Sequence, residues 1–193
     1  AFDFNSNSNG MVVGQTDEGR RRLNVVKSFY VKYTKKLPDL VNDFCKYYHY
    51  FRTHEVIFYY DTTALGSNYA VNDEDFRWVI CNQLEKNGWQ VRPVPIGRPM
   101  EHLEKQLLIN RGFDGRAHLV TYFNEQNNES LLISVQTAGV YNGKKDKRLE
   151  KTMETEESKL EERTDFSDAF ETLYIGCERF PQETVVLPVT SDF

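Results

Sequence analysis

The chain has 193 residues, of which 39% are hydrophobic and 27% are charged, a composition typical of one globular domain with a full core. Its formal net charge of −5 excludes a protein that coats nucleic acid through bulk positive potential, so any DNA contact has to come from local basic patches and metal ions. No apolar stretch approaches the length needed to span a bilayer, and we expect no membrane contact.

The three cysteines are widely separated and lack Cys-x-x-Cys spacing. This pattern predicts free, core or half-buried thiols in a reducing compartment rather than a disulfide framework or a zinc site.

The first third of the chain predicts three antiparallel strands followed by a helix. Asp3 lies in a short apolar run, and Asn9-Gly10 then favours a hairpin. The next elements expected are strands at residues 11–15 and 23–31, a turn at 17–19 between them, and a helix over 37–48. Because the sequence begins directly in a strand, we expect it to be part of a longer parent chain.

The remaining sequence predicts parallel strands alternating with helices. Residues 55–60 form an apolar run typical of a strand covered on both faces. The further elements expected are a helix at 73–86 that ends at Asn87-Gly88, a strand at 91–96, a helix at 99–109, an edge strand at 119–123 and a helix at 165–179. Residues 128–138 fit a helix or a strand, and the helix is favoured because Leu131, Leu132, Val135 and Ala138 share one face. We therefore expect an α/β fold with a mixed sheet, antiparallel in its first three strands and then parallel, flanked by helices. It forms one domain over residues 1–180 with a loosely attached tail at 181–193.

Three acidic residues lie at element ends that this arrangement can bring to one edge of the sheet. Asp3 and Asp61 belong to strand-like runs, and Asp168 lies at the start of the last helix. Carboxylate oxygens gathered in this way suit Mg²⁺ or Mn²⁺, and two such ions can hydrolyse a phosphodiester. Each acid also has an ordinary interpretation: a turn residue for Asp3, a cap of the strand end for Asp61, and an outer-face residue for Asp168. Asp165 is a good N-cap for the same helix.

Residues 141–163 are almost devoid of apolar side chains and contain a basic cluster. The cluster consists of Lys144, Lys145, Lys147, Arg148 and Lys151. These side chains suit phosphate contacts, and a solvated charged loop or an exposed helix is the alternative interpretation.

Taken together, the segments resemble the C-terminal nuclease domain of tailed-phage terminase large subunits over nearly the whole chain. The resemblance rests on Asp3-Phe4-Asn5, Tyr59-Tyr60-Asp61 before Thr62-Thr63-Ala64-Leu65-Gly66, residues 131–136 before Lys145-Asp146-Lys147 and Glu150-Lys151, and Thr164-Asp165-Phe166-Ser167-Asp168-Ala169. Asp168 rather than Asp165 takes the place of the family's last metal-binding Asp, which leaves Asp165 as a cap or a group supporting the ligands.

The resemblance implies a ribonuclease H-like fold and a two-metal endonuclease that uses Mg²⁺ or Mn²⁺, held by Asp3, Asp61 and Asp168, to cut concatemeric double-stranded DNA. It also implies a parent chain with an N-terminal packaging ATPase, which acts with a portal protein and a small terminase subunit in the cytoplasm of an infected bacterial host. The present sequence has no Gly-x-x-x-x-Gly-Lys-Ser/Thr loop of its own.

Two other functions remain compatible with the sequence. A ribonuclease H-like junction resolvase or transposase would use the same three acids. A non-catalytic module that docks on the portal or the small subunit would keep the fold without binding a divalent ion.

Overall fold

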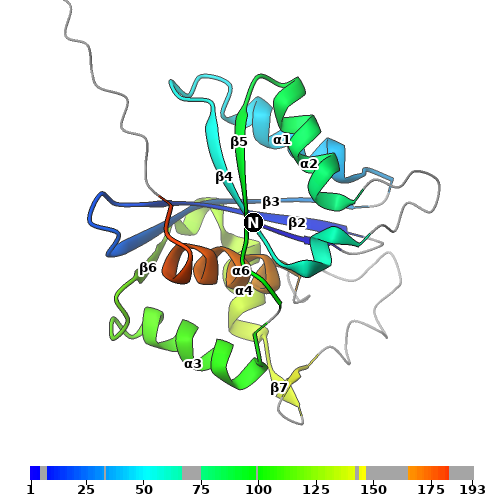
Figure 1. The fold of residues 1–193 in the computed structure, drawn as a ribbon. Coiled ribbons are helices and arrows are strands. Elements are labelled where there is room, and N and C mark those ends of the chain that lie inside the picture. The colour runs from blue at the N-terminus through cyan, green and yellow to red at the C-terminus, as the bar shows by residue number, and fades with distance from the viewer. Residues whose placement is uncertain are drawn as a thin grey trace, which may run out of the picture.

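The computed structural model describes residues 1–4, 8–32, 34–66, 75–98, 100–141, 144–146 and 165–182. The helices within these residues are α1 (Leu37–Tyr47), α2 (Phe76–Lys86), α3 (His102–Phe113), α4 (Glu129–Thr137) and α6 (Asp165–Arg179), with short 3₁₀ turns η1 (Thr62–Leu65) and η2 (Glu125–Asn127). The fold is α/β, and helices flank a mixed sheet (Figure 1).

The main sheet has the strand order β1-β2-β3-β6. Its strands are β1 (Phe2–Phe4), β2 (Ser8–Thr16), β3 (Arg22–Lys32) and β6 (Val120–Phe123). The first three pair antiparallel, with Asp3 opposite Gly10, whereas β6 lies parallel to β3 at the edge of the sheet. The predicted antiparallel opening and the edge strand are therefore confirmed.

A second ladder pairs β4 (Glu55–Tyr60) with β5 (Gln90–Pro95) in parallel. Gly88, with φ of 80°, occupies the left-handed region in the tight connection between α2 and β5, where a side chain would be strained. No ladder joins β4 to β1 among the described residues. Instead the Phe2 and Phe58 rings meet edge to face, with centroids 5.2 Å apart.

The sheet separates two apolar layers, as its side-chain alternation requires. Met11 points into the cluster formed with α1 and α2, whereas its neighbour Val12 points into the cluster formed with α6. Figure 1 shows α1 and α2 on one side of the sheet and α3, α4 and α6 on the other. Cys45 is buried and Cys81 and Cys177 are half-buried, all as free thiols, as predicted for core or half-buried side chains.

Helix α6 is the central element of its layer because it contacts β1, β2, β3 and β4 as well as α3 and α4. Its buried stripe follows helical spacing and consists of Phe166, Ala169, Phe170, Leu173 and Tyr174, each at most 5% exposed. Burying one large apolar side chain contributes about 1.5–3 kcal/mol, so this stripe stabilises the helix far more than its intrinsic propensity does.

Three parts of the chain differ from expectation. Asn9 and Gly10 lie within β2, opposite Phe4 and Asp3, rather than in the turn of the first hairpin. Helix α3 extends to Phe113 rather than ending at residue 109, and Gly115, with φ of 69°, follows its end. In the segment predicted as a solvated loop or helix, β7 (Val140–Tyr141) pairs with β8 (Lys144–Lys145). Two-residue strands are too short for an alternation pattern, although the intervening Asn142-Gly143 is a hairpin signal in the sequence.

The close approach of α6 to β4 gives a stability prediction. A Cβ atom on Gly176 would overlap the Tyr59 ring. Helix propensity alone would favour alanine by about 1 kcal/mol, whereas overpacking costs about 1–3 kcal/mol. We expect Gly176→Ala to lower the free energy of unfolding by up to about 2 kcal/mol in urea denaturation.

Gly19→Ala is the matched control, because a Cβ there comes no closer than 3.9 Å to the Asp17 carboxylate. Its free energy of unfolding should stay within about 0.5 kcal/mol of the wild-type value. A Gly176→Ala protein as stable as the wild type would contradict the packing argument.

Candidate functional site

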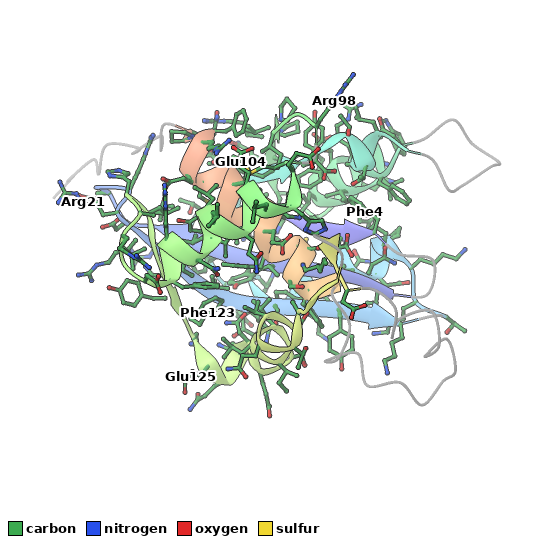
Figure 2. The ribbon with its side chains drawn as sticks, turned by 90° about the horizontal axis from the view of Figure 1, so that it is seen from below. Phe4, Arg21, Arg98, Glu104, Phe123 and Glu125 are labelled. Carbon is green, nitrogen blue, oxygen red and sulfur yellow. The ribbon has the colours of Figure 1, made fainter. Side chains whose placement is uncertain are left out.

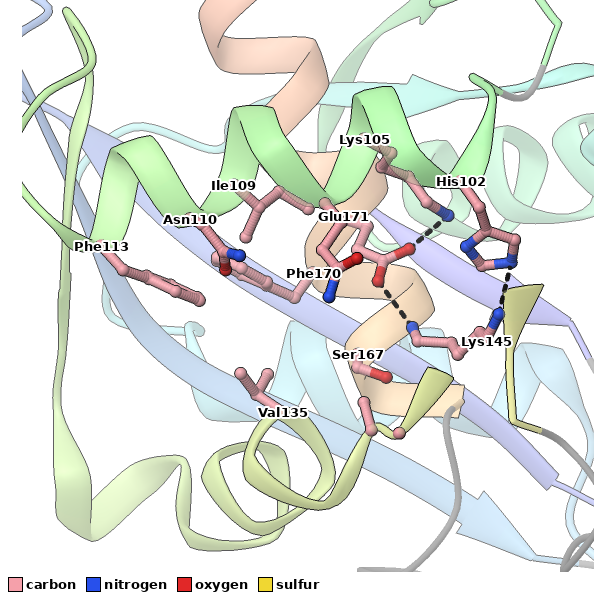
Figure 3. Close-up of a pocket in the computed structure, with 13 residues that line it drawn as sticks. His102, Lys105, Ile109, Asn110, Phe113, Val135, Lys145, Ser167, Phe170 and Glu171 are labelled. Atoms are coloured by element: carbon pink, nitrogen blue, oxygen red, sulfur yellow. Dashed lines mark hydrogen bonds and ion pairs between the residues drawn. The ribbon is translucent and has the colours of Figure 1, made fainter. Parts of the chain in front are cut away.

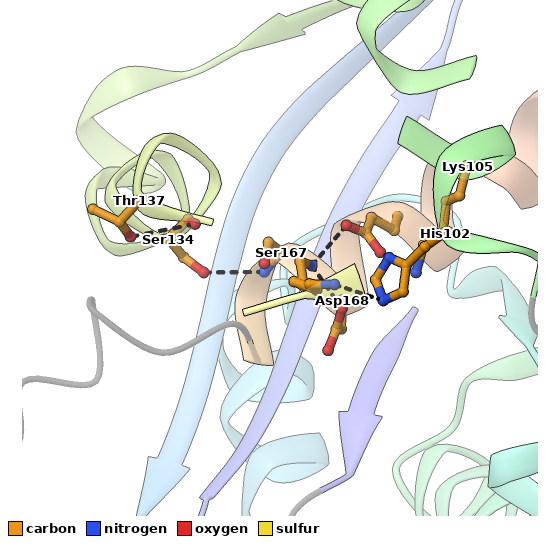
Figure 4. Close-up of polar contacts among 8 residues, drawn as sticks. His102, Lys105, Ser134, Thr137, Ser167 and Asp168 are labelled. Carbon is orange, nitrogen blue, oxygen red and sulfur yellow. Dashed lines mark hydrogen bonds and ion pairs between the residues drawn. The ribbon is translucent and has the colours of Figure 1, made fainter. Parts of the chain in front are cut away.

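The start of α6 is held by a contact from α4. The first four backbone N–H groups of a helix have no partner inside the helix. The N–H of Ser167 is one of them, and it donates to Ser134 Oγ at 3.2 Å (Figure 4). Both serines are at most 2% exposed. This buried bond fixes the first turn of α6, which carries Asp168.

Asp168 and Glu171 lie one helical turn apart and share a single cation. Lys145 Nζ is 2.6 Å from Asp168 Oδ1 and 2.6 Å from Glu171 Oε1. The Lys145 side chain is only 6% exposed, against 17% for Asp168 and 14% for Glu171. At this burial, removing one partner of such a cluster typically costs about 3–5 kcal/mol, because the remaining charge loses its compensation.

The cluster continues from Glu171 to α3. Lys105, on the first turns of α3, forms an ion pair with Glu171 Oε2 (Figure 3). Two carboxylates and two ammonium groups therefore alternate along the cluster, in the order Asp168, Lys145, Glu171, Lys105. Charge-assisted contacts of this kind are stronger than neutral hydrogen bonds and define the relative position of three elements.

Backbone hydrogen bonds of the β7–β8 hairpin position Lys145 next to Asp168 and Glu171. The Lys145 N–H donates to His102 Nε2 at 3.0 Å, and the Asp146 N–H donates to the Gly139 carbonyl at 2.8 Å. Accepting through Nε2 requires a neutral His102 ring with its proton on Nδ1. Burial, followed by the nearby Lys105 charge, lowers the pKa of His102 below 6.5, which favours that neutral form.

Asp61 directly follows β4 and caps η1. Its Oδ1 accepts from the Thr63 N–H at 2.8 Å and from the Thr63 hydroxyl at 2.5 Å. Backbone bonds from Ile96 to Tyr60 and from Thr62 to Gly97 hold the loop on both sides of Asp61. The capping interpretation of Asp61 is therefore confirmed, and the same contacts orient the carboxylate.

Asp61 and Glu171 border one hollow of about 250 Å³ between the strand ends, α3 and α6. Its charged lining comprises Asp61, Arg98, Glu104, Lys105, Glu171 and Arg179. Arg179 pairs with Glu104 at 2.9 Å, while Figure 2 shows Arg98 extending away from the body of the protein. A second hollow of about 100 Å³ lies between α3, α4 and the hairpin, and the Lys105–Glu171 pair borders both.

Asp3 is half-buried on the face of the sheet that α6 covers. The flanking Phe2 and Phe4 belong to the opposite apolar layer, and alternation along the strand then directs Asp3 toward the layer of α6. Its partner across the ladder, Gly10, lies on the same face as Val12, which packs against α6.

The predicted acids thus converge on the surroundings of α6, but not on one point. Within the described residues, no three His, Cys, Asp or Glu side chains form a group able to hold a metal ion. Asp168 is joined to Glu171 through Lys145, and Asp61 and Glu171 line the same hollow. The side chain of Asp165 lies outside the described part of the structure.

Among the predicted basic residues, Lys145 is buried in the ion-pair cluster rather than exposed in a solvated loop. Lys147, Arg148, Lys151 and the side chain of Lys144 lie outside the described residues. Sequence reasoning missed Glu171 and Lys105, and it assigned His102 only a core or surface role. The i, i+3 spacing of Asp168 and Glu171 on an amphipathic helix was a signal that could have indicated Glu171.

Comparisons with protein-family models, with curated proteins and with solved structures found no match. In the described part of the chain, no helix combines the length and the apolar character needed to cross a membrane.

The environment of His102 gives a second prediction. We expect the His102 pKa, measured by NMR titration, to lie below 6.5 and to rise in Lys105→Met, which removes a nearby positive charge. As the pH falls, the His102 ring is protonated at a higher pH in the unfolded chain than in the folded protein. The His102 contribution to the free energy of unfolding therefore decreases as the pH drops from about 6.5 through the folded pKa. A folded His102 pKa at or above 6.5 would contradict the proposed hydrogen bond to Lys145.

Proposed function

We propose that this chain is a divalent-metal-dependent DNA endonuclease domain of the terminase large-subunit type. The observation that carries the proposal is the convergence of two α6 carboxylates, Asp168 and Glu171, on one positive charge. The same helix contacts β1 and β4, the strands that carry or precede Asp3 and Asp61.

The topology supports this proposal. Three antiparallel strands come first, a parallel pair follows, and the last helix packs over the sheet with an acid in its first turn. The elements that carry Asp3, Asp61 and Asp168 therefore follow one another along the chain as the resemblance to the terminase nuclease domain implies. We therefore propose that this α/β fold is ribonuclease H-like.

The chemistry of the donor groups fits Mg²⁺ or Mn²⁺. Hard divalent cations prefer carboxylate oxygens, and Asp168 and Glu171 already direct one oxygen each at a cation. The residues proposed to hold metal are Asp3, Asp61 and Asp168, with Glu171 as a further donor and Asp165 as a support. The ions would supply activation of water and stabilisation of the leaving oxygen.

The chain itself supplies orientation and local positive charge. Thr63 orients the Asp61 carboxylate, and the Ser134–Ser167 bond fixes the turn that bears Asp168. In a chain of net charge −5, Arg98, which borders the larger hollow and extends away from the body of the protein, offers a place for a DNA phosphate. The basic segment with Lys144, Lys147, Arg148 and Lys151 is proposed to extend this contact.

The proposed setting follows from the same resemblance. Double-stranded DNA is the substrate, and the portal protein and the small terminase subunit are partners of a parent chain that also carries the packaging ATPase. The location is the cytoplasm of an infected bacterial host. A junction resolvase or transposase would use the same acids on a different DNA substrate.

A non-catalytic docking module is the second candidate, and one observation favours it. The carboxylates of Asp168 and Glu171 are already neutralised by lysines, as in an ordinary structural ion-pair network. Such a module would neither bind Mn²⁺ nor cut DNA.

Nicking of supercoiled plasmid separates the two candidates. We expect cleavage without ATP in Mn²⁺ and in Mg²⁺, and none in EDTA. Asp3→Asn, Asp61→Asn and Asp168→Asn should each lower the rate at least about 100-fold, because loss of groups that only support metal ligands already costs about 10- to 100-fold.

Asp114→Asn is the control, since Asp114 is exposed beyond the far end of α3 and pairs with Arg116. It should cut DNA at the wild-type rate. Cleavage that persists in EDTA, or that is unaffected by all three site variants, would contradict the metal-dependent mechanism.

A further inference from the structure

We infer that Lys145 is an internal competitor for the divalent cation: its ammonium group occupies the metal-binding side of Asp168 and Glu171 and has to leave when an ion binds. The inference rests on the proposed function, because it concerns loading of the same site. It assigns to Lys145 a role other than the phosphate contact expected from the sequence.

The geometry places the ammonium where a cation would be held. Nζ lies 2.6 Å from one oxygen of each carboxylate. Asp168 and Glu171 are one turn apart on a helix fixed by buried contacts, so their carboxylates project toward the same place and can both reach one cation. The side chain of Lys145 is 6% exposed, and among the described residues both of its ion pairs are with these two acids.

Simultaneous occupancy by both cations is unfavourable. A divalent ion bound to the same oxygens would face the ammonium group a few ångströms away in a site largely shielded from water, where charges repel more strongly than in bulk solvent. Lys105 adds a further positive charge on the other oxygen of Glu171. Metal binding therefore has to displace Lys145, and the apparent metal affinity is reduced by the stability of the Lys145 contacts.

The attachment of Lys145 allows this displacement. Its side chain is a flexible four-carbon stem, whereas the backbone is held separately by the bond to His102 and by the Asp146 bond to Gly139. The ammonium group can thus leave the carboxylates without breaking the hairpin. Movement of the side chain alone is enough to open the site.

The first test measures Mn²⁺ affinity by electron paramagnetic resonance in the intact chain without DNA. Lys145→Met removes the charge and retains an apolar stem of similar length, and it should bind Mn²⁺ at least about 10-fold more tightly than the wild type, because the competing cation is gone. Lys145→Arg keeps the charge and should gain no affinity. Lys35→Met is the matched control, because Lys35 pairs with Asp43 on the exposed side of α1.

An unchanged or weaker Mn²⁺ affinity in Lys145→Met would overturn the inference. If the wild type cuts DNA in Mn²⁺ and loses this activity in Asp168→Asn, such a result leaves the proposed function intact. Absence of Mn²⁺ binding in the wild type and in every variant would instead overturn the proposed function together with the inference.

A second test needs no substitution, so it remains decisive if Lys145→Met does not fold. Lysines of the wild-type protein are acetylated briefly with and without Mn²⁺, and the modified positions are quantified by mass spectrometry. We expect Mn²⁺ to raise acetylation of Lys145 several-fold while that of Lys35 stays constant. Lys145 acetylation that is unchanged or lower in Mn²⁺ would show that the ammonium group is not displaced.

Discussion

The packing of α6 against the sheet is the constraint on which the rest of the structure depends. The buried stripe from Phe166 to Tyr174 sets the rotation of the helix about its axis, and this rotation decides where its polar residues lie. Asp168 and Glu171 consequently flank the stripe and face α3 and the hairpin instead of solvent. The far end of the helix is held by close contact of Gly176 with Tyr59, whose hydroxyl donates to the Phe180 carbonyl at 3.1 Å.

Electrostatics then follows from packing. Two carboxylates forced into a half-buried position need compensation, and Lys145 and Lys105 provide it from two different elements. The network therefore joins α6, α3 and the β7–β8 hairpin more specifically than apolar contact alone would. In this network two carboxylates are balanced by two lysines. A nuclease site, in contrast, needs surplus negative charge to hold divalent ions. The proposed displacement of Lys145 by the metal ion would supply that surplus.

Local sequence patterns predicted most of the elements and the antiparallel pairing of the first three strands, but not the strand order beyond them. Strands such as residues 55–60 and helices such as 165–179 carry clear apolar patterns, and both were confirmed within a few residues. The pairing of β3 with β6 and the separate β4–β5 ladder could not be derived, because strand order depends on contacts between segments far apart in the chain.

For the candidate site, the sequence predicted three acidic residues but not the side chains that contact them. Asp3, Asp61 and Asp168 were selected from their positions at element ends, and the structure directs them toward the surroundings of one helix. The partnership of Lys145 with Asp168 and Glu171 was not accessible, because a lysine in a charged segment looks the same in sequence whether it is solvated or buried. The burial of Lys145 becomes visible only in the structure, where the β7–β8 hairpin and its hydrogen bond to His102 hold this residue against α3.

The most direct test of the central claim, that α6 brings Asp168 to a divalent-ion site shared with Asp3 and Asp61, is anomalous diffraction from crystals grown in Mn²⁺. We expect manganese peaks within direct coordination distance of the Asp168 carboxylate and of at least one of the other two acids. Manganese peaks confined to other acidic residues, or their absence from all three acids at saturating Mn²⁺, would contradict the claim.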